Sequence, residues 1–171
     1  MSVLLEPWPY PGESELRELY SAVDQKYCLV QLPVPLPAAE TRKYLAMIHA
    51  GGNEERSLLT RAVIVDVSLA GKIELSGTGE DTELDIVLRK DMTGKGYGSE
   101  ALRLLVDEIR NNALYPCITA YVHEENIHAR RMFAKAGMRQ IRPFRADILI
   151  PSGGQYRLKE TEGYEYLLLL E

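Results

Sequence analysis

The chain has 171 residues, a formal net charge of −5 at pH 7, 46% hydrophobic residues and 26% charged residues. This composition is ordinary for a globular protein, and the length fits one domain, residues 1–171, with a substantial core. The acidic balance argues against a general nucleic-acid-binding surface, and no apolar run approaches the ~20 residues of a membrane-spanning helix.

The two cysteines, Cys28 and Cys117, match no metal-binding or redox spacing. Buried reduced thiols are therefore expected, which is typical of a cytoplasmic protein. The N-terminus shows neither the basic region nor the long apolar core of a secretory signal. The sequence thus predicts a cytoplasmic protein with no metal, no membrane partner and no nucleic-acid partner.

The first third of the chain predicts one strand and two helices. Residues 3–5 favour a short edge strand, and Ser14 is the expected N-cap of a helix that runs to about Val23. A second helix is expected from Ala38 to about Ala50, because Gly51 follows it as a typical C-terminal residue.

From residue 57 the pattern changes to strands. Residues 63–65 and 73–75 predict two of them, with either Asp66 or Ala70-Gly71 as the turn between them. A third strand is expected over 82–88.

The remaining elements alternate between the two kinds. We expect a helix over 97–111, a strand over 117–122 and a helix over 126–136, then strands near 138–150 and 164–170. The resulting order is β, α, α, β, β, β, α, β, α, β, β. It predicts a mixed sheet with one parallel unit around the 97–111 helix and antiparallel hairpins elsewhere.

Gly94, Gly96 and Gly98 stand between the strand over 82–88 and the helix that follows. Residues without a Cβ let the backbone turn sharply and approach a ligand closely. The first N–H groups of a helix have no intrahelical acceptor, and the helix dipole adds partial positive charge there. The loop is therefore a candidate phosphate site with Lys95 at its rim, and the alternative is a tight turn without a ligand.

The spacing of these glycines separates three kinds of phosphate-binding loop. A Walker loop requires GxxxxGK[ST], but Arg89 occupies the position of its first glycine. The dinucleotide-binding pattern GxGxxG fails because the spacing here is GxGxG. Residues 93–98 instead resemble motif A of the GNAT superfamily, the acetyl-CoA-dependent N-acetyltransferases, with the pattern Gln/Arg-x-x-Gly-x-Gly/Ala. Thr93 stands where that pattern has Gln or Arg, which can remove one side-chain contact to pyrophosphate and leaves the backbone cradle.

A second stretch, residues 122–138, is similar to motif B of the same superfamily, N-x-x-[SA]-x-x-x-[YFL]-x-K-x-G-[FM]. The matching positions are Asn126, Ala129, Phe133, Lys135, Gly137 and Met138. The two motifs cover about residues 55–140, and the order of predicted elements extends the resemblance over the whole chain. It implies a mixed α/β fold, the GNAT acyl-CoA N-acyltransferase fold, whose central mixed sheet has about six or seven strands flanked by about four helices.

The resemblance also implies acetyl-CoA as cosubstrate and indicates which residues would hold it. Asn126 would bond the pantetheine arm, cap the helix that begins there, or do both. Arg130 and Lys135 would either meet the nucleotide phosphates or lie in solvent, and His128 is interpreted as a surface residue. The implied cofactor-binding residues are Ile86, Val87, Leu88, Thr93, Gly94, Lys95, Gly96, Tyr97, Gly98, Ser99, Asn126, Arg130, Phe133 and Lys135.

Phe133 departs from the commonest form of motif B. Many GNAT enzymes hold there a tyrosine that protonates the departing thiolate of CoA, and phenylalanine has no proton to donate. Branches that acetylate protein N-termini, including those related to ribosomal-protein acetyltransferases, also lack this tyrosine, and the chain resembles them. Either water protonates the thiolate or it leaves unprotonated, because a thiol pKa near ~8.5 makes it a tolerable leaving group.

The implied reaction needs a base, because an amine with a pKa of roughly 8–10 must lose a proton before it attacks a thioester. Glu83 and Asp85 lie on one face of the 82–88 strand, and related enzymes use a Glu near the Glu83 position as base or amine ligand. The alternative is that both are ordinary polar residues of a half-exposed strand. Tyr121 is a third catalytic candidate. The backbone N–H of Val87 or Leu88 would polarise the thioester carbonyl.

Two functions of different class follow from this resemblance. One is an N-acetyltransferase that acts on a small amine, an amino acid or a protein N-terminus by direct transfer in a ternary complex, since no nucleophilic cysteine with a histidine partner is evident. The other is a catalytically silent acyl-CoA-binding module with a regulatory or partner role, favoured by Phe133 and Thr93. A toxin that acetylates charged tRNA is a third interpretation, which the negative net charge disfavours. A monomer or homodimer is expected, and residues 24–56 and 142–163 would set the specificity.

Overall fold

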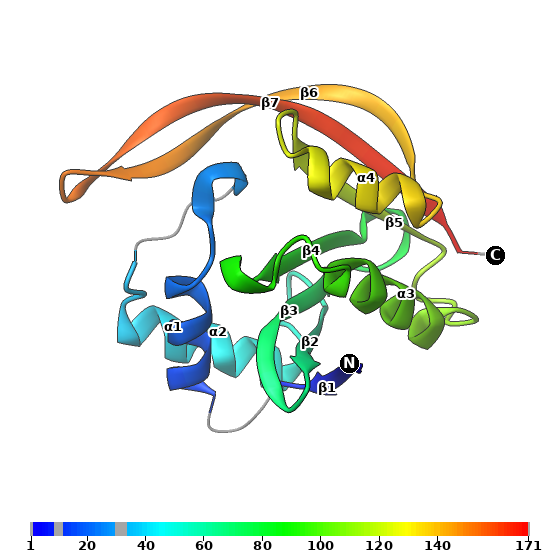
Figure 1. Cartoon of the computed structure of the whole chain (residues 1–171), viewed down its shortest axis with the longest axis horizontal. Coiled ribbons are helices and arrows are strands. Elements are labelled where there is room, and N and C mark those ends of the chain that lie inside the picture. The colour runs from blue at the N-terminus through cyan, green and yellow to red at the C-terminus, as the bar shows by residue number, and fades with distance from the viewer. Residues whose placement is uncertain (1, 9–11, 30–33, 171) are drawn as a thin grey trace.

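The computed structural model describes residues 2–8, 12–29 and 34–170. Within them, seven strands form one sheet in the order β1-β2-β3-β4-β5-β7-β6 (Figure 1). The strands are β1 Val3–Pro7, β2 Leu58–Val65, β3 Ser68–Ser76, β4 Glu83–Leu88, β5 Cys117–His123, β6 Arg139–Ser152 and β7 Gln155–Leu169.

Four α-helices lie within the described residues: α1 Glu13–Ser21, α2 Ala38–Ala50, α3 Tyr97–Ile109 and α4 Ile127–Lys135. The described residues also contain three short 3-10 helices, which lie in connections between these elements: η1 Gln25–Tyr27, η2 Gly79–Asp81 and η3 Lys90–Met92. The seven-stranded mixed sheet with its four helices confirms the fold class that the sequence predicts.

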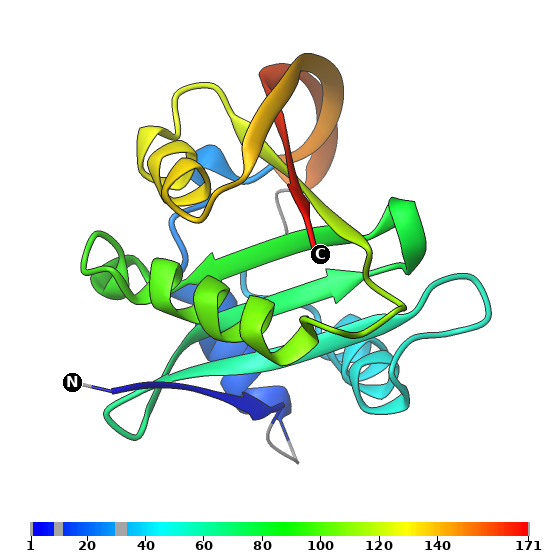
Figure 2. The same cartoon turned by 90° about the vertical axis from the view of Figure 1, so that its right-hand side faces the viewer.

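The helices cover both faces of the sheet (Figures 1 and 2). On one face, α3 and α4 pack on a core that includes Ile73 and Leu75 of β3. On the other, α1 and α2 enclose a second core around Trp8. Because side chains alternate along a strand, Lys72 and Glu74 point away from the first core, toward α1 and α2. This places two charged residues inside the molecule.

The strands β4 and β5 form the parallel unit of the sheet, with α3 as the crossover between them. Within the described residues their register contains one pair, Glu83 with Thr119, whereas β3 and β4 pair over six residues. Beyond Glu83 the two strands therefore separate. The sheet opens there, between the end of β4 and the start of α4.

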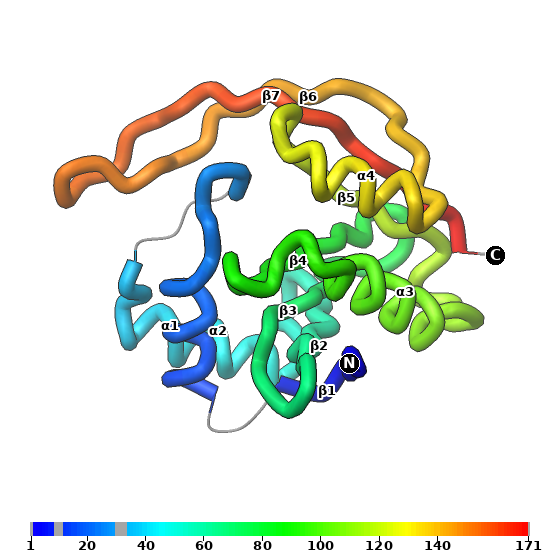
Figure 3. Tube along the Cα trace, in the orientation of Figure 1, coloured from blue at the N-terminus to red at the C-terminus, as the bar shows by residue number. Residues whose placement is uncertain are grey.

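The chain ends in a long antiparallel hairpin of β6 and β7, whose arm extends past the rest of the molecule (Figure 3). We expected the last strand to begin near residue 164, but β7 begins at Gln155. The added residues carry no sustained apolar alternation, because most of this arm is exposed on both faces. Periodicity therefore gives no signal there.

Two local expectations are also settled by the structure. Ser14 was the expected N-cap of the first helix, but α1 begins at Glu13 with Gly12 at the N-cap position. The turn between β2 and β3 falls at Asp66 and Val67, both with positive φ, and not at Ala70-Gly71. No helix among the described residues is long and apolar enough to cross a membrane.

Candidate functional site

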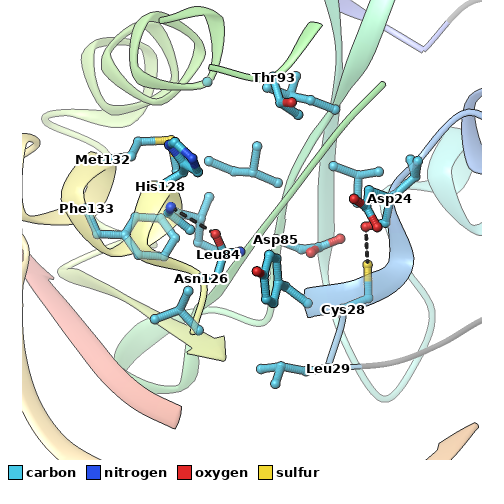
Figure 4. Close-up of a pocket in the computed structure, with 18 of the residues that line it drawn as sticks. Asp24, Cys28, Leu29, Leu84, Asp85, Thr93, Asn126, His128, Met132 and Phe133 are labelled. Atoms are coloured by element: carbon cyan, nitrogen blue, oxygen red, sulfur yellow. Dashed lines mark hydrogen bonds between the residues drawn. The ribbon is translucent and has the colours of Figure 1, made fainter. Parts of the chain in front are cut away.

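A cavity of about 660 Å³ occupies the opening between β4 and β5. The glycine loop and one face of α4 line one part, and segment 20–29, β4 and β5 line the other. In Figure 4, Asp24 and Cys28 lie on one side of Asp85, and Asn126, His128 and Met132 lie on the other. We call the part lined by Tyr20, Asp24, Cys28, Glu83, Asp85 and Tyr121 the carboxylate side.

The glycine loop forms the opposite end of the cavity. Gly94 and Gly96 line it with φ values of 73° and 86°, which favour glycine. A Cβ built on either residue meets nothing within 4 Å, so both border open space. At Gly98, by contrast, a Cβ would lie 2.9 Å from the sulfur of Met132. Gly98 is thus required for close packing, whereas Gly94 and Gly96 leave room for a ligand at the N-terminus of α3.

The exposed edge of β4 forms the wall between these two ends. Arg89 N–H donates to the carbonyl of Ala70 at 2.9 Å, and the carbonyl of Val87 faces Gly71, both on the β3 side. Because successive residues of a strand direct their backbone groups to alternate sides, Ile86 and Leu88 present theirs to the gap. Of the two residues proposed to polarise a thioester carbonyl, Leu88 therefore has the suitable orientation. The backbone groups of Val87 are turned to β3, although the residue still lines the cavity.

Asn126 lies at the start of α4 and lines the cavity. Its Oδ1 accepts the N–H of Ala129 at 3.1 Å, so the residue is the N-cap of α4. The capping oxygen is occupied, while the amide N–H₂ has two further hydrogens to donate. Phe133, which is 5% exposed, also lines the cavity and contacts Tyr166, with ring centroids 5.6 Å apart.

Most of the residues implied to bind cofactor line the cavity: Ile86, Val87, Leu88, Thr93, Gly94, Gly96, Gly98, Ser99, Asn126, Phe133 and Lys135. Three do not. Lys95 faces a different surface hollow beside Val3, and Tyr97 is buried in the core. Arg130 points away from the glycine loop. Its guanidinium donates to the carbonyl of Glu124 at 3.1 Å and lies 4.5 Å from the centroid of the Tyr164 ring.

All three catalytic candidates lie on the carboxylate side. Glu83 is 3.5 Å from the guanidinium of Arg56, with its side chain about half exposed. Asp85 Oδ2 is 3.3 Å from Nζ of Lys72. Tyr121 stacks edge-on against Phe144 of the hairpin, with centroids 5.4 Å apart. The structure thus brings the three groups to one end of the cavity.

Their surroundings shift the protonation of two of these groups. Burial raises the pKa of Glu83, Arg56 lowers it, and Asp85 raises it, so the net pKa lies above its ordinary value. Burial, followed by the charge of Glu165, raises the pKa of Tyr121. A carboxyl group with a raised pKa holds protons more strongly, which suits a base that must take one from an amine.

Several cavity residues were not anticipated from the sequence. Tyr20 of α1 is one of them. Asp24 and Cys28 fall within residues 24–56, which were expected to set the specificity although no motif marks individual residues there. Burial raises the pKa of the Cys28 thiol to about 11, which makes it a poor nucleophile. His128 is exposed, as expected, but it also lines the cavity. It shares a face of α4 with Arg131 and Lys135, and the steps of three and then four residues between these positions were the available signal.

The described residues contain no group of three or more His, Cys, Asp or Glu side chains that could hold a metal ion. The site thus combines a glycine loop, a separated β4 edge and a capped α4. The family model described as an acetyltransferase (GNAT) domain matches residues 4–139. The chain belongs to the GNAT acetyltransferase family.

Solved structures agree with the fold of this GNAT chain. Spermidine N-acetyltransferase from Vibrio cholerae, in complex with CoA and spermine, has a TM-score of 0.74 at 16% identity, over 98% of this chain and 95% of that one. RimL, a ribosomal α-N-protein acetyltransferase in complex with CoA, has a TM-score of 0.74 at 12% identity, over 99% and 95%.

A third similar structure is the ribosomal-protein-alanine N-acetyltransferase from Brucella melitensis. Its TM-score is 0.72 at 11% identity, over 99% of this chain and 100% of that one. A search of curated proteins finds no match. At these identities the structural likeness establishes the fold and leaves the acceptor open.

Proposed function

We propose that this chain is an acetyl-CoA-dependent N-acetyltransferase that transfers the acetyl group directly to an amine. The observation that carries the proposal is the single cavity along β4. It joins the glycine loop at one end to Glu83, Asp85 and Tyr121 at the other. One strand edge therefore connects a candidate pyrophosphate site with candidate groups for handling an amine.

Several features of the cavity support CoA binding. Gly94 and Gly96 border open space at the start of α3, where N–H groups without intrahelical acceptors favour a pyrophosphate. The backbone of Ile86 and Leu88 faces the gap, where it can bond the amide groups of a pantetheine arm. Asn126 contributes its amide hydrogens, and Lys135 contributes positive charge near the phosphates. When bound, acetyl-CoA supplies the activated acetyl thioester.

The residues on the carboxylate side supply the proton chemistry. An acceptor arrives mostly as an ammonium, and Glu83, directly or through water, takes a proton from it. The amine nitrogen then bonds to the acetyl carbon, the carbon–sulfur bond breaks, and the thiolate of CoA leaves with the electron pair. The second proton of the nitrogen passes to solvent as the amide forms. Phe133 has no proton to give this thiolate, so solvent supplies it. Leu88 N–H lies along the same wall and is suited to stabilise negative charge on the carbonyl oxygen.

The acceptor in this proposal is a primary amine, which is a small amine, an amino acid or a protein N-terminus. Two of the similar structures are enzymes named for their acceptors, spermidine and a ribosomal protein. This supports an amine acceptor and does not choose between a small molecule and a protein N-terminus.

The test combines binding with turnover. Calorimetry with CoA and acetyl-CoA is expected to give a micromolar Kd, about −8 kcal/mol, that a metal chelator does not change. A panel of polyamines, amino acids and N-terminal peptides, assayed by thiol release, is expected to contain at least one acceptor. Binding without turnover on the whole panel would instead favour a silent acyl-CoA-binding module, which Phe133 and Thr93 would suit. No binding of either CoA form would contradict both.

A further inference from the structure

Lys72 is a fully buried cation directly behind the carboxylate side of the cavity. It lies on β3, with a side chain 2% exposed, and it does not line the cavity. Its Nζ donates to the hydroxyl of Tyr44 at 2.7 Å. The same nitrogen lies 3.3 Å from Oε1 of Glu74 and 3.3 Å from Oδ2 of Asp85.

A lysine charge is expensive to bury and is kept only where anions and acceptors surround it. That condition is met here. Burial opposes the charge, but Tyr20, Asp85, Tyr44 and Glu74 together raise the pKa of Lys72 well above its ordinary value. These partners therefore favour the charged form of Lys72 inside the fold.

The two carboxylates that share Lys72 are held very differently. Glu74 is buried, and its Oε2 accepts hydrogen bonds from the hydroxyls of Tyr44 and Thr60, each at 2.6 Å. Asp85 is 57% exposed and lines the cavity, with its Oδ2 turned to Lys72. Glu74 is thus fixed within the interior, whereas Asp85 contacts the buried Lys72 on one side and the cavity on the other.

The charges of this group do not balance. Lys72 contributes one positive charge, whereas Glu74 and Asp85 contribute two negative ones. The excess negative charge lies on the exposed member, Asp85, because Glu74 is enclosed. Among the described residues, Tyr20, Cys28 and Glu83 also interact electrostatically with Asp85, and these three groups include no cation. A cationic ligand at Asp85 would restore the balance.

We propose that Lys72 is a positioning residue, which fixes the Asp85 carboxylate on the wall of the cavity as the anchor for the ammonium of the acceptor. This inference rests on the proposed acetyltransferase function and divides the work of the two acids. Asp85 binds the charged acceptor, and Glu83 takes its proton. Lys72 acts only through Asp85, since its own side chain is enclosed.

The experiment removes Lys72 without leaving Glu74 as an uncompensated buried charge, which would threaten folding. Four proteins all carry Glu74→Gln: this variant alone, and with Lys72→Met, with Asp85→Asn, or with both. Glu74→Gln alone is the matched control, because it leaves Lys72 beside Asp85. Steady-state thiol release gives kcat and the amine KM, and calorimetry with CoA and thermal unfolding report whether each protein is folded.

The expected result is a coupled pair. Asp85→Asn and Lys72→Met each lower kcat/KM by about 10- to 100-fold, mainly through the amine KM, and leave CoA affinity unchanged. Once Lys72 is absent, Asp85→Asn costs less than about threefold more, because the carboxylate is already misplaced.

Equal costs of Asp85→Asn with and without Lys72 would overturn the positioning role while the acetyltransferase function stands. An unchanged amine KM after Lys72→Met would overturn it as well. If the parent binds CoA and acetylates no amine, the proposed function fails, and the role of Asp85 as acceptor anchor fails with it.

Discussion

Glu83 of β4 is paired with Thr119 of β5 at the point where the two parallel strands stop running together. The junction is fixed by the N–H of Thr119, which donates to the carbonyl of Thr82 at 2.8 Å. Glu83, one of the two candidate carboxylates, thus lies at the base of the opening. Asp85, Ile86 and Leu88 follow along the wall of the opening. The order of residues along β4 therefore places the carboxylate side near Glu83 and the glycine loop beyond Leu88.

The glycine loop predicts a selective loss of CoA binding in Gly96→Asn. Asparagine tolerates the positive φ of this position and is a good N-cap, so α3 should form normally. Its side chain would occupy the open space beside the helix N-terminus. We expect CoA affinity to fall by about tenfold or more in calorimetry, at a loss of about 1.4 kcal/mol per tenfold.

The matched control for this variant is Gly153→Asn, at the tip of the β6–β7 hairpin. Gly153 also has positive φ and open space around its Cβ position, but it does not line the cavity. The Gly153→Asn variant should therefore bind CoA with the affinity of the parent. Parent-like affinity in both variants would make the loop a structural turn only.

Glu83→Gln should keep the shape of the cavity and lose most of the rate. General acid–base steps are worth about 10²–10⁴-fold, and the loss should shrink as pH rises toward the pKa of the amine, because free amine then forms unaided. The pH profile of kcat/KM for parent and variant measures this. Equal activity across pH 6–9 would remove Glu83 from the mechanism and leave Asp85 or Tyr121 as candidates.

The ion pair of Arg56 with Glu83 predicts a shift in the same profile. Arg56 lowers the pKa of Glu83, and the basic form of Glu83 exists only above that pKa. Arg56→Gln should therefore raise the pKa further and move the acidic limb of kcat/KM to higher pH. Arg61→Gln, which loses a pair with Glu108 on β2 and α3, is the control and should leave the limb in place. If the acidic limb does not move in Arg56→Gln, that limb does not report the titration of Glu83.

Phe133→Tyr should retain the parent rate or exceed it. The ring lines the cavity, and a hydroxyl there would stand where related enzymes place the acid that protonates the CoA thiolate. Steady-state kcat with a good acceptor is the measurement, with CoA affinity as the control for correct packing against Tyr166. A large loss of rate at unchanged CoA affinity would show that an apolar group is needed at this position.

Local sequence was sufficient to predict the elements that line the candidate cavity. The glycine loop, the helix after it and the capped start of α4 are each specified by neighbouring residues. The glycine spacing and Asn126 therefore led to the correct elements and family. Lys95 and Arg130 show the limit of such patterns. A motif gives the position of a side chain along the chain but not its direction, and these two point away from the cavity.

The buried charges of Lys72 and Glu74 could not be predicted from the sequence, for a different reason. Lys72 and Glu74 alternate with Ile73 and Leu75 along β3, which is the pattern of a strand with one solvated face. Tyr44 of α2 and Tyr20 of α1 cover that face instead, and these contacts join residues about 30 to 50 positions apart. Without the packing of α1 and α2, nothing marks Lys72 as different from a surface lysine.

The central claim is that one cavity brings acetyl-CoA and an amine together for direct transfer. The most direct measurement follows free CoA thiol and acetylated amine in the same reaction, with intact-protein mass spectrometry before and after the amine is added. The account predicts no thiol release and no acetylated protein without amine, and equal amounts of thiol and acetylated amine once it is present. CoA binding with neither product formed for any amine, or acetylated protein formed before the amine is added, would contradict it.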